Sequence, residues 1–182
     1  MGRRNPFFLA VFCVAALPAL ADFDASSYPP YERCALCHGL FGQSHTSKFP
    51  HLAGQKPNYI KAQLESFLAG TRTNDGGQMA AIVTELLPSD IPVVVEWFST
   101  QDAPLPGPTP SDATGKEAVE SLGCLTCHDT APETAPHLTA QHAGYLEKQM
   151  NDFRSGARSE LEISGMHQEL LDQHAQDVSA IA

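Results

Sequence analysis

The chain has 182 residues, which allows one large domain or two small ones. Its 21 acidic side chains outnumber 11 basic ones, giving a formal net charge of −10 at pH 7. This balance argues against nucleic acid and anionic membrane surfaces as partners and favours proteins that present a basic docking surface.

The N-terminus has the pattern of a secretory signal peptide. Arg3 and Arg4 precede an apolar run over 7–20, and an Ala-Leu-Ala sequence ends at Ala21. We therefore expect residues 1–21 to be removed near Ala21 and the mature protein to be periplasmic. The alternative is an uncleaved anchor, although the run is short against the about 20 residues that a membrane span needs. Without the two arginines, 9 basic residues face 21 acidic ones, a formal charge of −12.

The first candidate site is the pentapeptide Cys34-Ala-Leu-Cys37-His38, which has the C-x-x-C-H spacing typical of c-type haem attachment. The two thiols can form thioethers with the vinyl groups of one porphyrin, and the histidine can ligate its iron. A double proline at 29–30 can only open a helix, so the helix that carries the motif is predicted to be short.

Three more helices are predicted in this first unit. Pro57 opens one whose apolar face repeats at helical spacing as far as Gly70. A polar, glycine-containing loop then leads to a short helix over 79–87. Ser89 or Asp90 caps the last helix.

Residues 103–110 hold four alternating prolines, which favour a semi-rigid polyproline II linker of about 3.1 Å per residue. It divides a first domain over 22–102 from a second over 111–182. Each domain would be marginal on apolar burial alone, so a covalently held haem is expected to complete both cores.

The second unit repeats the order of the first. Thr114 caps a helix that leads to a second motif, Cys124-Leu-Thr-Cys127-His128, and an amphipathic helix ends at Gly156. Two C-x-x-C-H motifs predict two covalently bound haem c groups. The alternatives are zinc, which would want four converging ligands, and a thioredoxin-like redox pair. The mature chain has four cysteines, and with all four bound to haem no disulfide is expected.

The repeat extends well beyond the two motifs. Residues 50–55 match 136–141 at an offset of 86, and the motifs themselves pair at an offset of 90. Ala140 stands where the first unit has a glycine. A last helix from about 175 has no counterpart of the first unit's C-terminal aromatic residues, so either the sequence is cut short or the contact between first and last helices is weaker in this unit.

The sequence offers more than one candidate for the sixth iron ligand. Met79 and Met166 occupy equivalent repeat positions, and a thioether is a good haem ligand that raises the reduction potential. We favour these two methionines. The alternatives are that both fill gaps in the core, or that the repeated pair His51 and His137 gives bis-histidine ligation.

Further repeated residues suggest supporting roles around each haem. The carbonyls of Pro50 and Pro136 could accept a hydrogen bond from each proximal histidine and so fix its ring. Arg72 and Arg158 could bind haem propionates, although simple surface arginines remain the alternative. The repeated tyrosines at 59 and 145 are expected to pack beside haem.

With these residues together, the chain resembles the cytochrome c4 family of dihaem class I c-type cytochromes. The two motifs carry the likeness, with the repeated segments over 52–79 and 138–166. The resemblance implies an all-α fold of two tandem class I cytochrome c domains, each wrapped around one covalently attached haem. It also implies His38–Met79 and His128–Met166 ligation and electron transfer between the haems.

The function expected is that of a periplasmic electron carrier with no catalytic residues of its own. It would take electrons from a quinol-oxidising complex and pass them to a terminal oxidase or a reductase, associating with the membrane only through such partners. One alternative is the cytochrome subunit of a periplasmic dehydrogenase, such as a sulfide-oxidising flavocytochrome. Another is a self-contained dihaem enzyme, which would need an open iron site.

Overall fold

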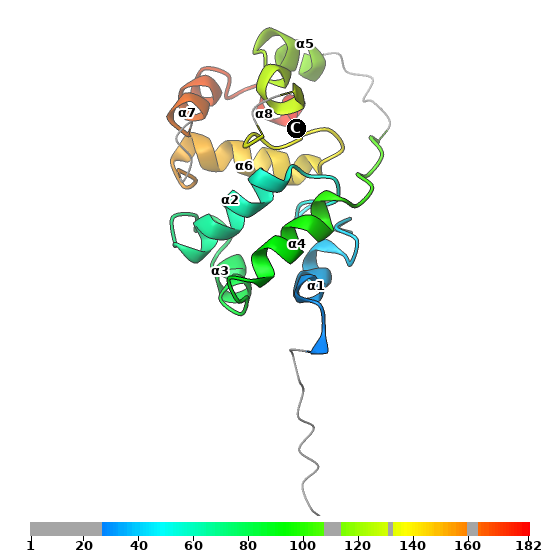
Figure 1. The fold of residues 1–182 in the computed structure, drawn as a ribbon. Helices are drawn as coiled ribbons and strands as arrows, with labels where there is room; N and C mark the ends of the chain where they lie inside the picture. The colour runs from blue at the N-terminus through cyan, green and yellow to red at the C-terminus, as the bar shows by residue number, and fades with distance from the viewer. Residues whose placement is uncertain (1–26, 108–113, 131–132, 160–163) are drawn as a thin grey trace, which may run out of the picture.

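The computed structural model describes residues 27–107, 114–130, 133–159 and 164–182, and the described residues form helices and loops without a β-strand. Figure 1 shows two groups of helices, α1–α4 and α5–α8, with α2 and α6 along the boundary between them. The all-α fold is therefore confirmed. The signal peptide predicted over 1–21 lies outside the described residues, as does part of the predicted linker.

The first unit follows the predicted order. Its elements are η2 (Pro30–Cys34), α1 (Ala35–His38), α2 (Pro57–Leu68), α3 (Gln78–Val83) and α4 (Asp90–Ser99). Pro30 and Pro57 stand at the first positions of η2 and α2, where a missing N–H costs nothing. The short helix predicted over 79–87 was wrong at its C-terminal end, because α3 ends at Val83. Ser89 is the N-cap residue of α4 but makes no side-chain capping bond.

The second unit contains α5 (Thr114–Ser121), η3 (Thr126–Thr130), α6 (Ala143–Ser155), α7 (Ser164–Gln173) and α8 (Val178–Ile181). α5 begins at Thr114, the residue predicted to cap it, and the predicted end of α6 at Gly156 is confirmed. η3 is a π-helical turn that carries Cys127 and His128 of the second motif. The last helix begins at Val178, three residues later than the sequence predicts, and a preceding helix, α7, carries Met166.

The two units have cores of different sizes among the described residues. In the first, eight buried residues form one cluster: Cys34, Ile60, Leu64, Phe67, Val83, Leu86, Val94 and Phe98. In the second, Phe153, Leu171 and Val178 form a smaller cluster, with Met150 packed against it. The apolar faces of α2 and α6 supply residues to the two clusters, as the helical spacing predicts.

The first and last helices of the second unit pack closely through a glycine. α5 packs against α8, and a Cβ atom on Gly115 would lie 1.9 Å from the carbonyl oxygen of Ala180. The sequence predicted a weaker contact between these two helices, because the second unit lacks the C-terminal aromatic residues. In the structure the backbones of the two helices instead approach each other closely. None of the helices in the described part of the chain is long and apolar enough to cross a membrane.

Reciprocal hydrogen bonds join the two units. Gln55 donates from Nε2 to the carbonyl of His137 (2.9 Å) and accepts the N–H of His137 at Oε1 (2.8 Å). Its repeat counterpart, Gln141, makes the same pair of bonds with the backbone of His51, at 3.0 and 2.8 Å. Because each unit presents the same residues to the other, the boundary has the self-complementary character of a twofold interface.

Candidate haem sites

His38 has one ring nitrogen satisfied and the other without a partner. Its Nδ1 lies 2.9 Å from the carbonyl oxygen of Pro50, whereas Nε2 is buried and has no hydrogen-bond partner. The residue is only 4% exposed, and burial lowers the pKa of His38, opposed by the bond to Pro50. A neutral imidazole whose Nδ1 donates to a carbonyl keeps the Nε2 lone pair for a metal.

His128 repeats this arrangement in the second unit. It lies within the π-helical turn η3, and its Nδ1 is 2.8 Å from the carbonyl oxygen of Pro136. The predicted role of the two proline carbonyls is therefore present at both sites. His128 is less buried than His38, so the second site is closer to solvent.

The four motif cysteines form no disulfide. Burial raises the pKa of the Cys34 thiol to about 11 and also raises that of Cys124. A thiol with a raised pKa is a poor redox nucleophile at neutral pH, which argues against the thioredoxin-like alternative. Cys127 is exposed. No group of three or more histidine, cysteine or acidic residues suited to a metal ion occurs among the described residues, which removes support for zinc.

The two candidate sixth ligands have different surroundings. Met79 lies in α3 and packs against the core of the first unit, and its backbone N–H donates to the side-chain carboxylate of Asp75. Met166 lies in α7 and is 56% exposed. His167, its neighbour, instead stacks on Phe153, with ring centroids 5.0 Å apart. The structure thus places one methionine against its core and the other at the surface.

The histidine pair considered for bis-histidine ligation is used at the boundary between units. The ring of His51 stacks on that of His142 at 4.0 Å between centroids and accepts the N–H of Ser44 at Nδ1 (3.0 Å). Burial, followed by the charges of His142 and His45, lowers the pKa of His51. The backbone of His137 bonds to Gln55, as described above.

Two buried arginines cross the boundary symmetrically. Arg72 donates to Gln149 (3.0 Å) and to the hydroxyl of Tyr145 (3.2 Å) in the other unit. Its counterpart Arg158 donates to Gln63 (3.0 Å) and Tyr59 (3.2 Å). Each arginine also bonds the repeated glutamine of its own unit.

These arginines are therefore not the simple surface residues considered as an alternative. The internal repeat showed that Arg72 and Arg158 occupy equivalent positions, but not that each donates to residues of the other unit. Gln55 and Gln141 are likewise equivalent in the repeat, and their bonds to the other unit were not predicted. The equivalent positions were the one sequence signal for these contacts.

The residues present fit a haem at each motif. At the first, the buried unpartnered Nε2 of His38 stands where an iron ligand is required, with Cys34 and Cys37 on the same short segment. At the second, Cys124, Cys127 and the anchored His128 repeat the donor set. Two such sites on a helical fold define a dihaem c-type cytochrome.

Comparison with known proteins agrees with this class. No family model matches the chain. Cytochrome c4 of Pseudomonas aeruginosa is 32% identical over 139 residues, which cover 69% of this chain and 68% of that protein. The crystal structure of reduced cytochrome c4 from Pseudomonas stutzeri superposes with a TM-score of 0.69 and 25% identity, covering 87% of this chain and 95% of that one. A thiosulfate dehydrogenase electron acceptor of Thiomonas intermedia is 28% identical over 87% of this chain and 80% of that protein.

The chain belongs to the cytochrome c4 family. It is a dihaem electron-transfer cytochrome and carries two covalently bound haem c groups. The resemblance drawn from the two motifs and the internal repeat is confirmed.

Proposed function

We propose that Cys34 and Cys37 attach the first haem and that His38 and Met79 ligate its iron. The observation that carries this assignment is the buried Nε2 of His38, which has no hydrogen-bond partner while Nδ1 is held by Pro50. The packing of Met79 against the adjacent core supports its role as the sixth ligand.

The second haem is assigned by the repeat. Cys124 and Cys127 attach it and His128 ligates its iron, supported by the matching bond from His128 to Pro136. Met166 is the sixth ligand by its equivalence to Met79 at an offset of 87. Since Met166 is 56% exposed, α7 must turn or shift to present the thioether when the haem is in place.

These ligands favour reversible one-electron transfer over catalysis. A haem iron with a histidine and a methionine ligand has no open position, and the methionine raises its reduction potential. The protein controls that potential through burial and through the bonds that hold each histidine. We therefore assign the chain as an electron carrier that has no substrate of its own.

The proposed domains are 22–102 and 111–182, joined by the proline-rich linker over 103–110. The signal-like sequence over 1–21 supports export and cleavage near Ala21, which would place the mature protein in the periplasm. There it would carry electrons from a quinol-oxidising complex to a terminal oxidase or reductase. The acidic composition supports partners with basic docking surfaces.

A second candidate function follows from the relatives described as thiosulfate dehydrogenase electron acceptors. In this case the chain would accept electrons from a periplasmic dehydrogenase whose catalytic centre lies on another protein. This function uses the same two haems and differs only in the donor.

A redox titration of the purified holoprotein tests the carrier assignment. We expect two reversible one-electron steps per chain, and no turnover of thiosulfate or hydrogen peroxide by the protein alone. Turnover, or a haem that binds added ligands in both oxidation states, would indicate an open iron and would overturn the assignment. Reduction by a thiosulfate dehydrogenase, but not by a quinol-oxidising complex, would select the second candidate function.

A further inference from the structure

The first haem motif and the residues directly after it form an apolar and exposed turn. Leu36 lies between the two cysteines and is 95% exposed. Leu40 and Phe41, which come directly after the motif, are 41% and 56% exposed. We call these three residues the apolar turn. Large apolar side chains grouped at the surface in this way are typical of binding sites.

The turn is held rigidly by the end of the first unit. The indole Nε1 of Trp97 donates to the carbonyl of Leu40 (2.8 Å), and the ring of Phe41 lies 6.0 Å from that of Trp97. Trp97 in turn stacks on Tyr31 at 4.0 Å. A surface whose side chains are fixed in advance loses little conformational entropy on binding.

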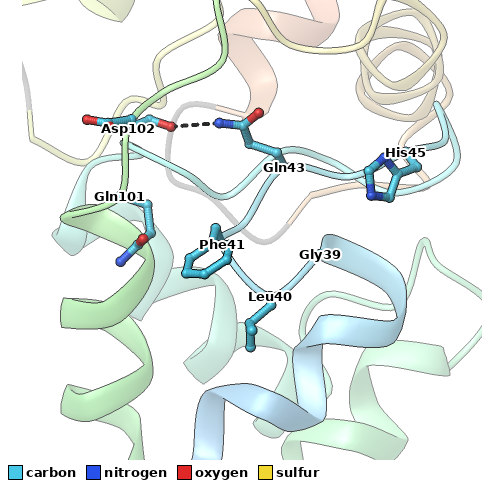
Figure 2. Close-up of a pocket in the computed structure, with 7 residues that line it drawn as sticks. All are labelled: Gly39, Leu40, Phe41, Gln43, His45, Gln101 and Asp102. Atoms are coloured by element: carbon cyan, nitrogen blue, oxygen red, sulfur yellow. Dashed lines mark hydrogen bonds between the residues drawn. The ribbon is translucent and has the colours of Figure 1, made fainter.

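A hollow of about 410 Å³ lies beside the turn. Figure 2 shows Leu40 and Phe41 on one side of it and the end of α4, with Gln101 and Asp102, on the other. Gln43 spans the gap by donating to the carbonyl of Asp102 (3.1 Å). The hollow gives a partner side chain a place to enter next to the motif.

The border of this surface is acidic. Asp102 lines the hollow, and two more exposed carboxylates adjoin the supporting aromatic residues in the chain, Glu32 after Tyr31 and Glu96 before Trp97. In the segments 28–45 and 95–105 the one lysine or arginine is Arg33, whose Nε lies 4.0 Å from a carboxylate oxygen of Glu85. An apolar centre with a charged border is the common composition of a protein interface, and the sign of the border selects a basic partner.

The sequence of the second unit does not repeat the three residues of the apolar turn. At the offset of 90 that aligns the motifs, threonine, threonine and alanine at 126, 130 and 131 replace the leucines and phenylalanine. The internal repeat therefore preserves the proposed haem ligands but not the apolar turn.

We propose that the apolar turn and its acidic border form the docking site of a redox protein with an apolar contact surface ringed by basic residues, so that electrons are exchanged with partners through the first haem. This proposal rests on the proposed function, because it places the partner against the segment that attaches the first haem. The second haem then exchanges electrons with the first across the boundary between units.

The test uses the ferrous holoprotein and two oxidants in stopped-flow experiments. One oxidant is the ferric form of a lysine-rich monohaem cytochrome c, and the other is ferricyanide, a small anion that needs no apolar contact. The test variant is Leu36→Gln/Phe41→Gln, and the matched control is Leu87→Gln, which changes an exposed leucine between α3 and α4. A second variant, Asp102→Asn/Glu32→Gln, tests the border.

We expect the double apolar variant to slow the reaction with the basic cytochrome by roughly tenfold, the effect of losing a central interface contact. Its rate with ferricyanide and both rates of the control should stay within about twofold of the unmodified protein. The border variant should weaken the dependence of the rate on salt.

Three results would overturn the proposal. Equal rates for the unmodified protein and the apolar variant with the basic cytochrome would show that docking lies elsewhere, while normal oxidation by ferricyanide would leave the carrier function intact. A holoprotein that neither oxidant oxidises would instead contradict the carrier function itself. A dimer in sedimentation that the apolar variant dissociates would show that a second copy of the chain covers the surface.

Discussion

The first unit buries eight core residues in one cluster, with Met79 packed against it and His38 almost fully enclosed. The second unit repeats the anchored histidine but buries three residues in its cluster, and Met166 lies at the surface. Among the described residues, the same proposed set of haem ligands is therefore placed on two polypeptide cores of unequal size. In the second unit the haem must supply more of the core, so folding and haem attachment are expected to be more tightly coupled there.

The sharpest test of this difference removes each haem in turn. In Cys124→Ala/Cys127→Ala, we expect α5–α8 to lose their protection against protease, because the remaining apolar cluster is too small to hold them together. In Cys34→Ala/Cys37→Ala, the larger core should leave α2 and α4 more resistant. Limited proteolysis with mass spectrometry measures this, with one haem per chain verified in each variant. Equal loss of protection in the two units would contradict the comparison.

The next largest effect is expected from a substitution where α5 packs closely against α8. A methyl group at Gly115 would meet the carbonyl oxygen of Ala180, so Gly115→Ala should lower the free energy of unfolding of the second unit by about 3 kcal/mol. Gly165 in α7 has open space around it, and Gly165→Ala is the matched control. Chemical denaturation of the holoprotein compares them. An unchanged midpoint for the first variant would mean that the two helices do not meet as described.

The boundary between units should depend equally on both of its glutamines. Gln55→Ala and Gln141→Ala each remove a pair of bonds to the other unit's backbone, at a cost of about 2 kcal/mol. We expect either substitution to separate the unfolding of the two units into distinct transitions, seen by calorimetry. A single, unshifted transition would show that the units are coupled by other contacts.

A smaller effect is expected at Ala140, which has φ of 62° and stands where the first unit has Gly54, with φ of 67°. An L-residue in this left-handed region costs about 1 kcal/mol, so Ala140→Gly should stabilise the second unit by that amount. The reverse change, Gly54→Ala, should destabilise the first unit more, because its Cβ would also lie 2.8 Å from that of Ala103. Thermal unfolding of both variants checks the sign and the order.

The smallest expected effect is a pH dependence at the boundary. The pKa of His51 is lowered in the folded protein by burial and by the charges of His142 and His45. The unfolded chain therefore takes up this proton at higher pH than the folded one, and stability should fall as the pH drops below about 6.5, the ordinary histidine value. His142→Gln should reduce that dependence in denaturation measured between pH 5 and 8. An unchanged dependence would show that the stacked pair carries no charge repulsion.

Much of the fold was accessible from sequence because its signals are local. Prolines at first helical positions, helical spacing of apolar residues and terminal glycines located α2 and α6 closely. The end of α3 was not predicted, since no glycine or proline marks it before Pro88. After Val83 the backbone continues in turns, in which Glu85 donates to Ile82 and Leu86 to Val83, while Val83 and Leu86 are buried in the core of the first unit. This tertiary packing has no local signal in the sequence.

In the candidate sites, too, the features with a local sequence signal were predicted and those that depend on tertiary packing were not. The motif spacing identified His38 and His128, and the repeat identified the prolines that hold them. The partners of Gln55, Gln141 and the two arginines could not be predicted, because residues about 80 to 100 positions apart in the chain meet only when the units pack. The unequal surroundings of Met79 and Met166 likewise depend on tertiary structure.

The measurement that tests the central claim most directly is the absorption spectrum of the ferric holoprotein, with haem quantified per chain. The account predicts two haems and a methionine-to-iron charge-transfer band of full strength for two His–Met sites, halved in both Met79→Ala and Met166→Ala. A band of half strength in the unmodified protein, unaffected by Met166→Ala, would contradict the claim that both units ligate iron in the same way.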